Sequence, residues 1–127
     1  MSLSDPEIDA LRALISEEQG RVARTIESLT ISFADIAETA ALDPPDDEHD
    51  PEGSTTGFER AQVSALLAQA VADAAAFDDA LARLEGGTFG RCRPCGVMIA
   101  MPRLLALPST TTCFDCASRG RSLVVRT

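Results

Sequence analysis

The chain contains no tryptophan, tyrosine or lysine, and it has only five phenylalanines and one histidine. Surfaces that bind single-stranded nucleic acid stack bases on aromatic side chains. The few aromatic residues of this chain do not favour such a surface. The sequence also lacks an uninterrupted apolar run of about 18 residues, which excludes a membrane-spanning helix. Its first residues carry neither the basic nor the apolar segment of a secretory signal. We therefore expect a soluble, cytoplasmic protein.

Acidic side chains outnumber basic ones, with 20 Asp and Glu against 11 Arg and a net charge of −9. The charge is divided along the chain, because residues 1–89 carry a net −14 and residues 90–127 a net +5. Duplex DNA is bound mainly through its phosphates, so direct sequence-specific DNA binding is not expected of so acidic a chain. A length of 127 residues is consistent with one domain, or with one domain and a small appendage.

Apolar periodicity predicts two long helices. The first, over residues 5–41, begins with a capping box in which Ser4 precedes Glu7 by three residues. Its apolar stripe has helical spacing and comprises Ile8, Leu11, Ile15, Val22, Ile26, Leu29, Phe33, Ile36 and Ala40. The second helix, over residues 54–85, has the alternating steps of a coiled-coil seam at Val63, Leu67, Ala70, Ala74, Phe77, Leu81 and Leu84.

The segment between these helices, residues 42–53, contains three prolines and a glycine and is predicted to be an acidic turn. A short turn joins two helices most simply as an antiparallel hairpin. We therefore predict a mainly α fold in which residues 1–86 form a long coiled-coil hairpin. A compact bundle is the alternative, but the sequence offers no third helix long enough to complete it.

The four cysteines lie in the C-terminal third as two Cys-x-x-Cys pairs separated by 17 residues, namely Cys92, Cys95, Cys113 and Cys116. This spacing is typical of structural zinc held by four thiolates, so we predict one zinc ion in a finger over residues 87–127. A redox pair would need a thioredoxin-like strand and helix. Zinc binding would also supply folding free energy that so short a segment cannot obtain from its own core.

The pattern does not indicate an enzyme. The single histidine, His49, lies in the acidic turn, far along the chain from the cysteines, and is expected to be solvated. A metal hydrolase would need a metal position open to water and a general base, which four matched cysteines do not offer. An EF-hand in the acidic turn is disfavoured by its prolines and by the missing ladder of calcium ligands.

The residues around the cysteines resemble the finger of the DksA/TraR family. The resemblance is carried by Gly87-Thr88-Phe89-Gly90-Arg91-Cys92, Cys95-Gly96, Ile99, Arg103-Leu104, Ala106, Pro108 and Cys113-Phe114-Asp115-Cys116. It implies a bacterial transcription regulator with a helical hairpin attached to a four-cysteine finger. Such regulators bind RNA polymerase rather than promoter DNA and insert the hairpin tip through the secondary channel. They often act with a nucleotide alarmone, for which these residues identify no site.

The resemblance also implies a role for the turn, where family members carry Asp-x-x-Asp-x-Ala. Here Asp47 and Asp50 keep the aspartate spacing, while Glu52 stands where the alanine would be. We expect polymerase contacts at this tip, because acids would be steered towards a basic or metal-containing cleft. The expected contact residues are Asp46, Asp47, Asp50 and Glu52. A solvated, solubilising turn is the alternative interpretation.

Arginines of the finger form a second set of expected contacts. Arg91 and Arg93 could reach an acidic protein surface or a phosphate, or they could be the hydrated exterior of the module. Arg103 is expected to pack against the finger or the hairpin. The alternative function is a zinc-finger adaptor whose hairpin binds another protein without acting at the polymerase active centre. Such an adaptor would depend on the seam and finger surfaces more than on the tip acids.

Overall fold

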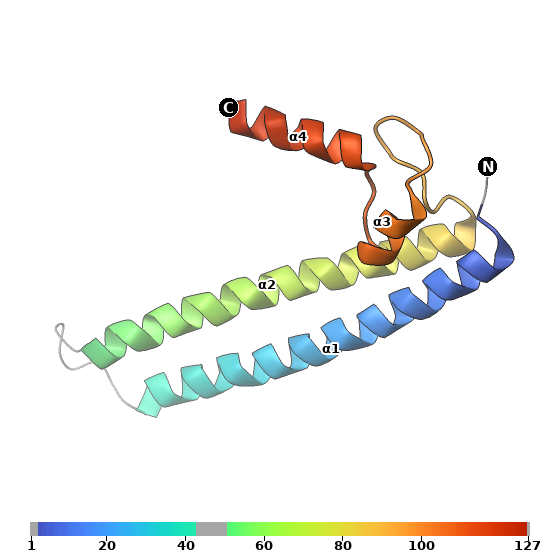
Figure 1. Cartoon of the computed structure of the whole chain (residues 1–127). Helices are drawn as coiled ribbons and strands as arrows, with labels where there is room; N and C mark the ends of the chain where they lie inside the picture. Colours follow the sequence, from blue (N-terminus) through green and yellow to red (C-terminus); the bar gives the residue numbers. More distant parts are fainter. Residues whose placement is uncertain (1–2, 43–50, 127) are drawn as a thin grey trace. The chain divides into compact units, whose positions relative to one another are not determined.

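The structure, a computed structural model, describes residues 3–42 and 51–126, with side chains described at 3–39 and 55–120. In this part of the chain the helices are α1 (Asp5–Leu42), α2 (Pro51–Gly86), α3 (Met101–Ala106) and α4 (Phe114–Arg126) (Figure 1). Extended pairing between the described residues is limited to one antiparallel bridge between Arg91 and Met98. The mainly α prediction is confirmed, with α1 and α2 packed together as a helical hairpin. Within the described ranges, no helix is long and apolar enough to cross a membrane.

Contacts divide the chain into two compact units. The first unit comprises the chain up to Gln19 together with everything from Ala75 onward, and the second unit comprises Gly20–Ala74. The sequence pattern placed a boundary between residues 86 and 87, whereas the contacts group the finger with the adjoining ends of α1 and α2. A segment as short as the finger buries little apolar surface alone, so packing on these helix ends enlarges its core.

The start of α1 has the predicted capping box. The backbone N–H of Ser4 donates to Glu7 Oε1 at 2.8 Å, and the backbone N–H of Glu7 donates to Ser4 Oγ at 3.3 Å. The hydrogen bond from the Ser4 backbone lowers the pKa of Glu7, because it favours the carboxylate. Two N–H groups that lack partners inside the helix are thereby satisfied.

The bounds of α2 differ slightly from the predicted 54–85. The helix begins at Pro51, within the predicted turn, because proline at the first helical position loses no hydrogen bond and has a suitable φ. It ends in a Schellman motif, in which Thr88 N donates to Arg83 O at 2.9 Å and Gly87 N to Leu84 O at 3.4 Å. Gly87 has a φ of 81°, a conformation that strains residues with a Cβ atom.

In the second unit, α1 and α2 pack along the predicted apolar stripes. Val22 on α1 is 2% exposed and Ala70 on α2 is 6% exposed. The other stripe positions described in this unit are half-buried, namely Ile26, Leu29, Phe33, Ile36, Val63, Leu67 and Ala74. The small side chain of Ala70 fits a close approach of the partner helix. The periodicity therefore identified the contact face of both helices correctly.

The first unit contains the larger core. From α1 it buries Leu11 and Ile15 completely, and from α2 it buries Phe77, Ala80 and Leu84. The finger adds Phe89, Cys92, Ile99 and Leu104 to this set of buried residues. Two polar contacts join the helices at its edge: Arg12 Nε donates to Glu85 Oε1 at 2.7 Å, and Gln19 Nε2 to Asp78 Oδ1 at 2.8 Å. Apolar residues of the finger and of both helix ends thus share one folded unit.

Candidate metal centre

The first cysteine pair lies in a tight turn, the first knuckle, formed by residues 91–98. Cys92 N donates to Val97 O and Gly96 N donates to Cys92 O, both at 2.8 Å. Gly96 has a φ of 78°, which lets the backbone reverse immediately after Cys95. These bonds close the turn, so that both thiols of the pair can face the same point.

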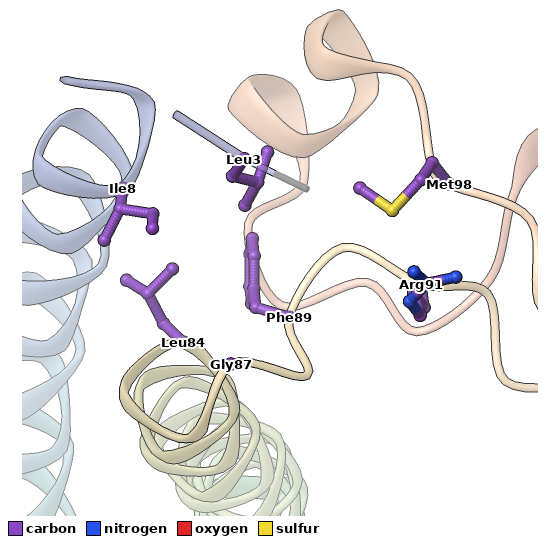
Figure 2. A pocket seen from close by; sticks show the side chains of 7 residues that line it. All are labelled: Leu3, Ile8, Leu84, Gly87, Phe89, Arg91 and Met98. Carbon is purple, nitrogen blue, oxygen red and sulfur yellow. The ribbon is translucent and has the colours of Figure 1, made fainter. Parts of the chain in front are cut away.

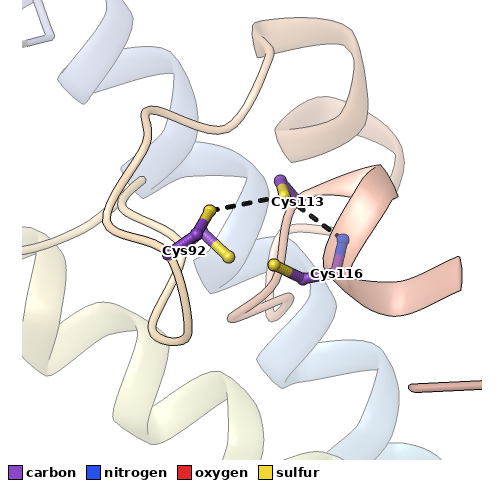
Figure 3. Close-up of side chains that lie close together, drawn as sticks. Cys92, Cys113 and Cys116 are labelled. Carbon is purple, nitrogen blue, oxygen red and sulfur yellow. Dashed lines mark hydrogen bonds between the residues drawn. The ribbon is translucent and has the colours of Figure 1, made fainter. Parts of the chain in front are cut away.

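The second pair lies at the beginning of α4, in the second knuckle, residues 112–117. Cys113 directly precedes the helix, and its backbone O accepts from Ala117 N at 3.0 Å. Its sulfur accepts a hydrogen bond from Cys116 N at 3.5 Å (Figure 3). Cys113 therefore caps α4, because its sulfur accepts from an N–H group that lacks a partner inside the helix.

The four sulfur atoms come together as one cluster. All of them lie within 4.8 Å of one another, and the Sγ atoms of Cys95 and Cys113 are 3.8 Å apart. A zinc–sulfur distance of about 2.3 Å in a tetrahedron implies sulfur–sulfur edges of about 3.8 Å. The donor set, its number and its spacing thus fit one zinc ion with four thiolate ligands, as predicted from the sequence.

Burial differs between the ligands. Cys92 is 1% exposed, Cys113 and Cys116 are half-buried, and Cys95 is exposed. All four are free thiols rather than disulfides. Each position of a tetrahedron can thus be filled by sulfur, so the arrangement is that of a closed structural site rather than a catalytic one.

The electrostatics of the cluster are compatible with a bound cation. Burial opposes ionisation of Cys92, but hydrogen bonds from the backbone N–H groups of Cys113 and Cys95 lower its pKa to about 6. Next to it, the pKa of Cys116 is raised to about 12, chiefly by its interaction with the Cys92 sulfur. Ionisation of Cys92 therefore opposes ionisation of Cys116. A bound dication removes that obstacle, because coordination deprotonates the thiols.

The segment between the knuckles is anchored by backbone acceptors. In α3, Leu104 is completely buried, and Arg103 Nε donates to Thr112 O at 2.9 Å. The backbone N–H of Arg93, in the first knuckle, donates to Thr111 O at 2.9 Å. Both bonds hold the residues just before Cys113. The bond from Arg103 shows that this side chain packs against the finger, which is one of the two expected positions.

Both the backbone conformation at position 90 and the atoms close to it favour glycine there. It has a φ of 89°, and a Cβ atom there would lie 3.4 Å from Met98 Cε and 3.6 Å from Leu104 Cδ1. Met98 also lines a cavity of about 130 Å³ with Leu3, Ile8, Leu84, Gly87, Phe89 and Arg91 (Figure 2). The entry to the first knuckle is thus closely packed, and a largely apolar cavity borders it.

The arginines expected to make external contacts already have partners within the chain. Arg93 Nη2 lies 3.2 Å from Asp79 Oδ2, on α2, and the same carboxylate accepts from Arg83 Nε at 2.9 Å. Arg91 is exposed, and its Nη1 donates to Gly96 O at 3.4 Å. Contacts of Arg91 and Arg93 with another molecule stay a prediction. Of the tip residues, Asp46, Asp47 and Asp50 lie outside the described residues, as does the side chain of Glu52.

Sequence reasoning missed two contacts around the finger. Arg119 Nη2 donates to the sulfur of Cys116 at 3.5 Å, and the pKa of Arg119 is raised chiefly by that hydrogen bond. The signal was available, because residues three apart on a helix lie on one face. The guanidinium of Arg83 lies 5.5 Å from the centre of the Phe89 ring. That contact depends on where α2 ends, and no sequence spacing predicts it.

Comparison with known proteins finds a family match for the finger. Residues 87–119 match the family described as the prokaryotic dksA/traR C4-type zinc finger. An uncharacterised protein of Aquifex aeolicus (strain VF5) is 50% identical over 40 residues, which is 32% of this chain. That match spans only 28% of the Aquifex protein.

A solved structure is similar over most of the chain. The structure of transcription factor DksA2 from Pseudomonas aeruginosa superposes with a TM-score of 0.78 at 22% identity, covering 94% of this chain and 86% of that one. Together with the fit of the four sulfurs to zinc, these matches identify the centre. Residues 87–119 match the DksA/TraR C4-type zinc finger family, and the chain has a fold similar to that of DksA2.

Proposed function

We propose that this protein is a transcription regulator that binds RNA polymerase directly and places the acidic segment between α1 and α2 in the secondary channel. The observation that carries the proposal is the DksA/TraR-type finger attached to a two-helix hairpin similar to that of a transcription factor. The segment linking the two helices also fits the role, since six of the ten residues at 43–52 are acidic. Negative charge there favours entry into a basic or metal-containing cleft.

Each part has a distinct task in this proposal. Four thiolates around zinc fix the two knuckles, and the metal supplies structural stability rather than chemistry. The seam holds α1 and α2 together as a hairpin, and the segment linking them is the part presented to the polymerase. The tip acids Asp46, Asp47, Asp50 and Glu52 make the contacts that alter initiation.

The test is a comparison of two variants with the same change in charge. In the tip variant, Asp46, Asp47, Asp50 and Glu52 become Ala, and in the control variant four exposed acids of α1 become Ala, namely Glu17, Glu27, Asp35 and Glu38. Binding to core RNA polymerase and run-off transcription are measured at one salt concentration, because screening changes charge-driven association. We expect the parent and the control variant to bind and regulate, and the tip variant to lose regulation while keeping its helicity.

Two results would refute the proposal. Regulation by the tip variant at the level of the parent would show that the acids do not act at the polymerase. Failure of the folded, zinc-loaded parent to bind polymerase would show that the partner is another protein.

An adaptor is the second candidate, and exposed apolar side chains on α2 favour it. Phe58 is 72% exposed, Leu66 is 51% exposed and Val71 is 53% exposed. Such residues are common in protein contacts. The adaptor predicts that Phe58→Ser abolishes partner binding while the tip variant binds normally, which is the reverse of the order expected for the polymerase regulator.

A further inference from the structure

The thiolates of the metal centre are supported by different kinds of donor. The Cys92 and Cys113 sulfurs accept hydrogen bonds from backbone N–H groups, which the fold of the knuckles fixes in place. Cys116 instead accepts from a charged side chain, the guanidinium of Arg119, with an Nη2–Sγ distance of 3.5 Å. A single substitution can therefore remove this donor without altering the backbone.

The contact arises from α4 itself. Cys116 and Arg119 are three residues apart in a helix that begins at Phe114, so their side chains lie on the same face. Cys113, which caps the helix, fixes the start of this turn through its bond to Cys116 N. The position of the guanidinium is thus tied to the position of two ligands.

Charge makes this contact more than a surface hydrogen bond. Four thiolates around one Zn²⁺ ion leave a net negative charge on the cluster, which a neighbouring guanidinium offsets. Hydrogen bonds between an ionised donor and an ionised acceptor are stronger than neutral ones. Groups that contact metal ligands from outside typically change metal affinity by 10- to 100-fold when they are removed.

We propose that Arg119 is a positioning residue of the metal centre, whose guanidinium holds the Cys116 thiolate in its coordinating orientation and slows the loss of zinc. This inference concerns the retention of the metal. It is independent of whether the protein acts on RNA polymerase.

The test compares the full-length, zinc-loaded parent with Arg119→Gln, Arg119→Lys and the control Arg60→Gln. Arg60 is exposed on α2 in the second unit, so its replacement removes the same charge away from the finger. Zinc affinity is measured by competition with a chromophoric chelator, and the release rate is followed by transfer of zinc to that chelator. Glutamine suits a helix as well as arginine does, so α4 should be retained, which circular dichroism checks.

We expect zinc to bind Arg119→Gln about 10-fold more weakly and to leave it correspondingly faster. Arg119→Lys should recover most of the affinity because it keeps a positive donor, and Arg60→Gln should match the parent. Cobalt substitution provides a second readout, since a displaced Cys116 thiolate shifts the sulfur-to-cobalt absorption in Arg119→Gln. The proposal is overturned if Arg119→Gln stays within about twofold of the parent, or if Arg60→Gln loses as much affinity.

Discussion

Removal of zinc is expected to unfold both knuckles of the finger while α1 and α2 stay largely helical. Few bonds hold the first knuckle without the metal, notably Cys92 N to Val97 O and Gly96 N to Cys92 O. Metal binding contributes an apparent folding free energy of about 10–16 kcal/mol in isolated zinc-finger peptides. The long helices also bury Val22 and Ala70 in the second unit, which contains none of the cysteines.

The measurement uses the zinc-loaded protein before and after equilibration with an excess of a strong chelator. Far-UV circular dichroism reports helix content, and amide hydrogen exchange at Cys92 and Gly96 reports the first knuckle. Protection at these amides should be lost, most helicity should remain, and adding zinc back should restore the exchange pattern. The account is contradicted if most helicity disappears with the metal, or if protection in the knuckle survives its removal.

Replacing Leu104 by Ala should destabilise the first unit strongly, by about 2–5 kcal/mol. The side chain of Leu104 is completely buried in α3, and its Cδ1 atom would lie 3.6 Å from a Cβ atom at position 90. Truncation removes buried apolar surface and leaves a cavity. The side chains of the short finger can fill this cavity only partly.

Leu105 is the matched control, because it is the next residue of the same helix and is 48% exposed. Leu105→Ala should cost less than about 1 kcal/mol, since much of its side chain is already in water. Denaturant unfolding of both variants is measured at one fixed zinc concentration, because bound metal stabilises the folded state by mass action. An equal loss of stability in the two variants would mean that the face of α3 that carries Leu104 is not buried as described.

The elements that could be predicted from the sequence are those set by local spacing. The Cys-x-x-Cys pairs predicted the ligand set, and the four sulfurs lie within 4.8 Å of one another. The capping box at Ser4 and the apolar stripes predicted the start and the packing face of α1. These features depend only on residues that are close together in the sequence, so they can be predicted without a structure.

The features that could not be predicted depend on contacts between distant segments. Ala80 is completely buried, yet an alanine adds too little hydropathy to stand out in an Ala-rich helix. Asp79 accepts from both Arg83 and Arg93, a link between α2 and the first knuckle that no spacing rule provides. The boundary of the first unit likewise follows from packing, since the finger shares its core with both helix ends.

The most direct measurement of the central claim is photocrosslinking to RNA polymerase from position 58. Phe58 lies in α2 shortly after its start at Pro51 and is 72% exposed, so a photoreactive aromatic residue can replace it without disturbing the seam. The labelled, zinc-loaded protein is mixed with core polymerase and irradiated, and crosslinked peptides are identified by mass spectrometry. We expect peptides that line the secondary channel, competed away by excess unlabelled parent. Crosslinks elsewhere on the polymerase, or none at all from a folded protein, would contradict the account.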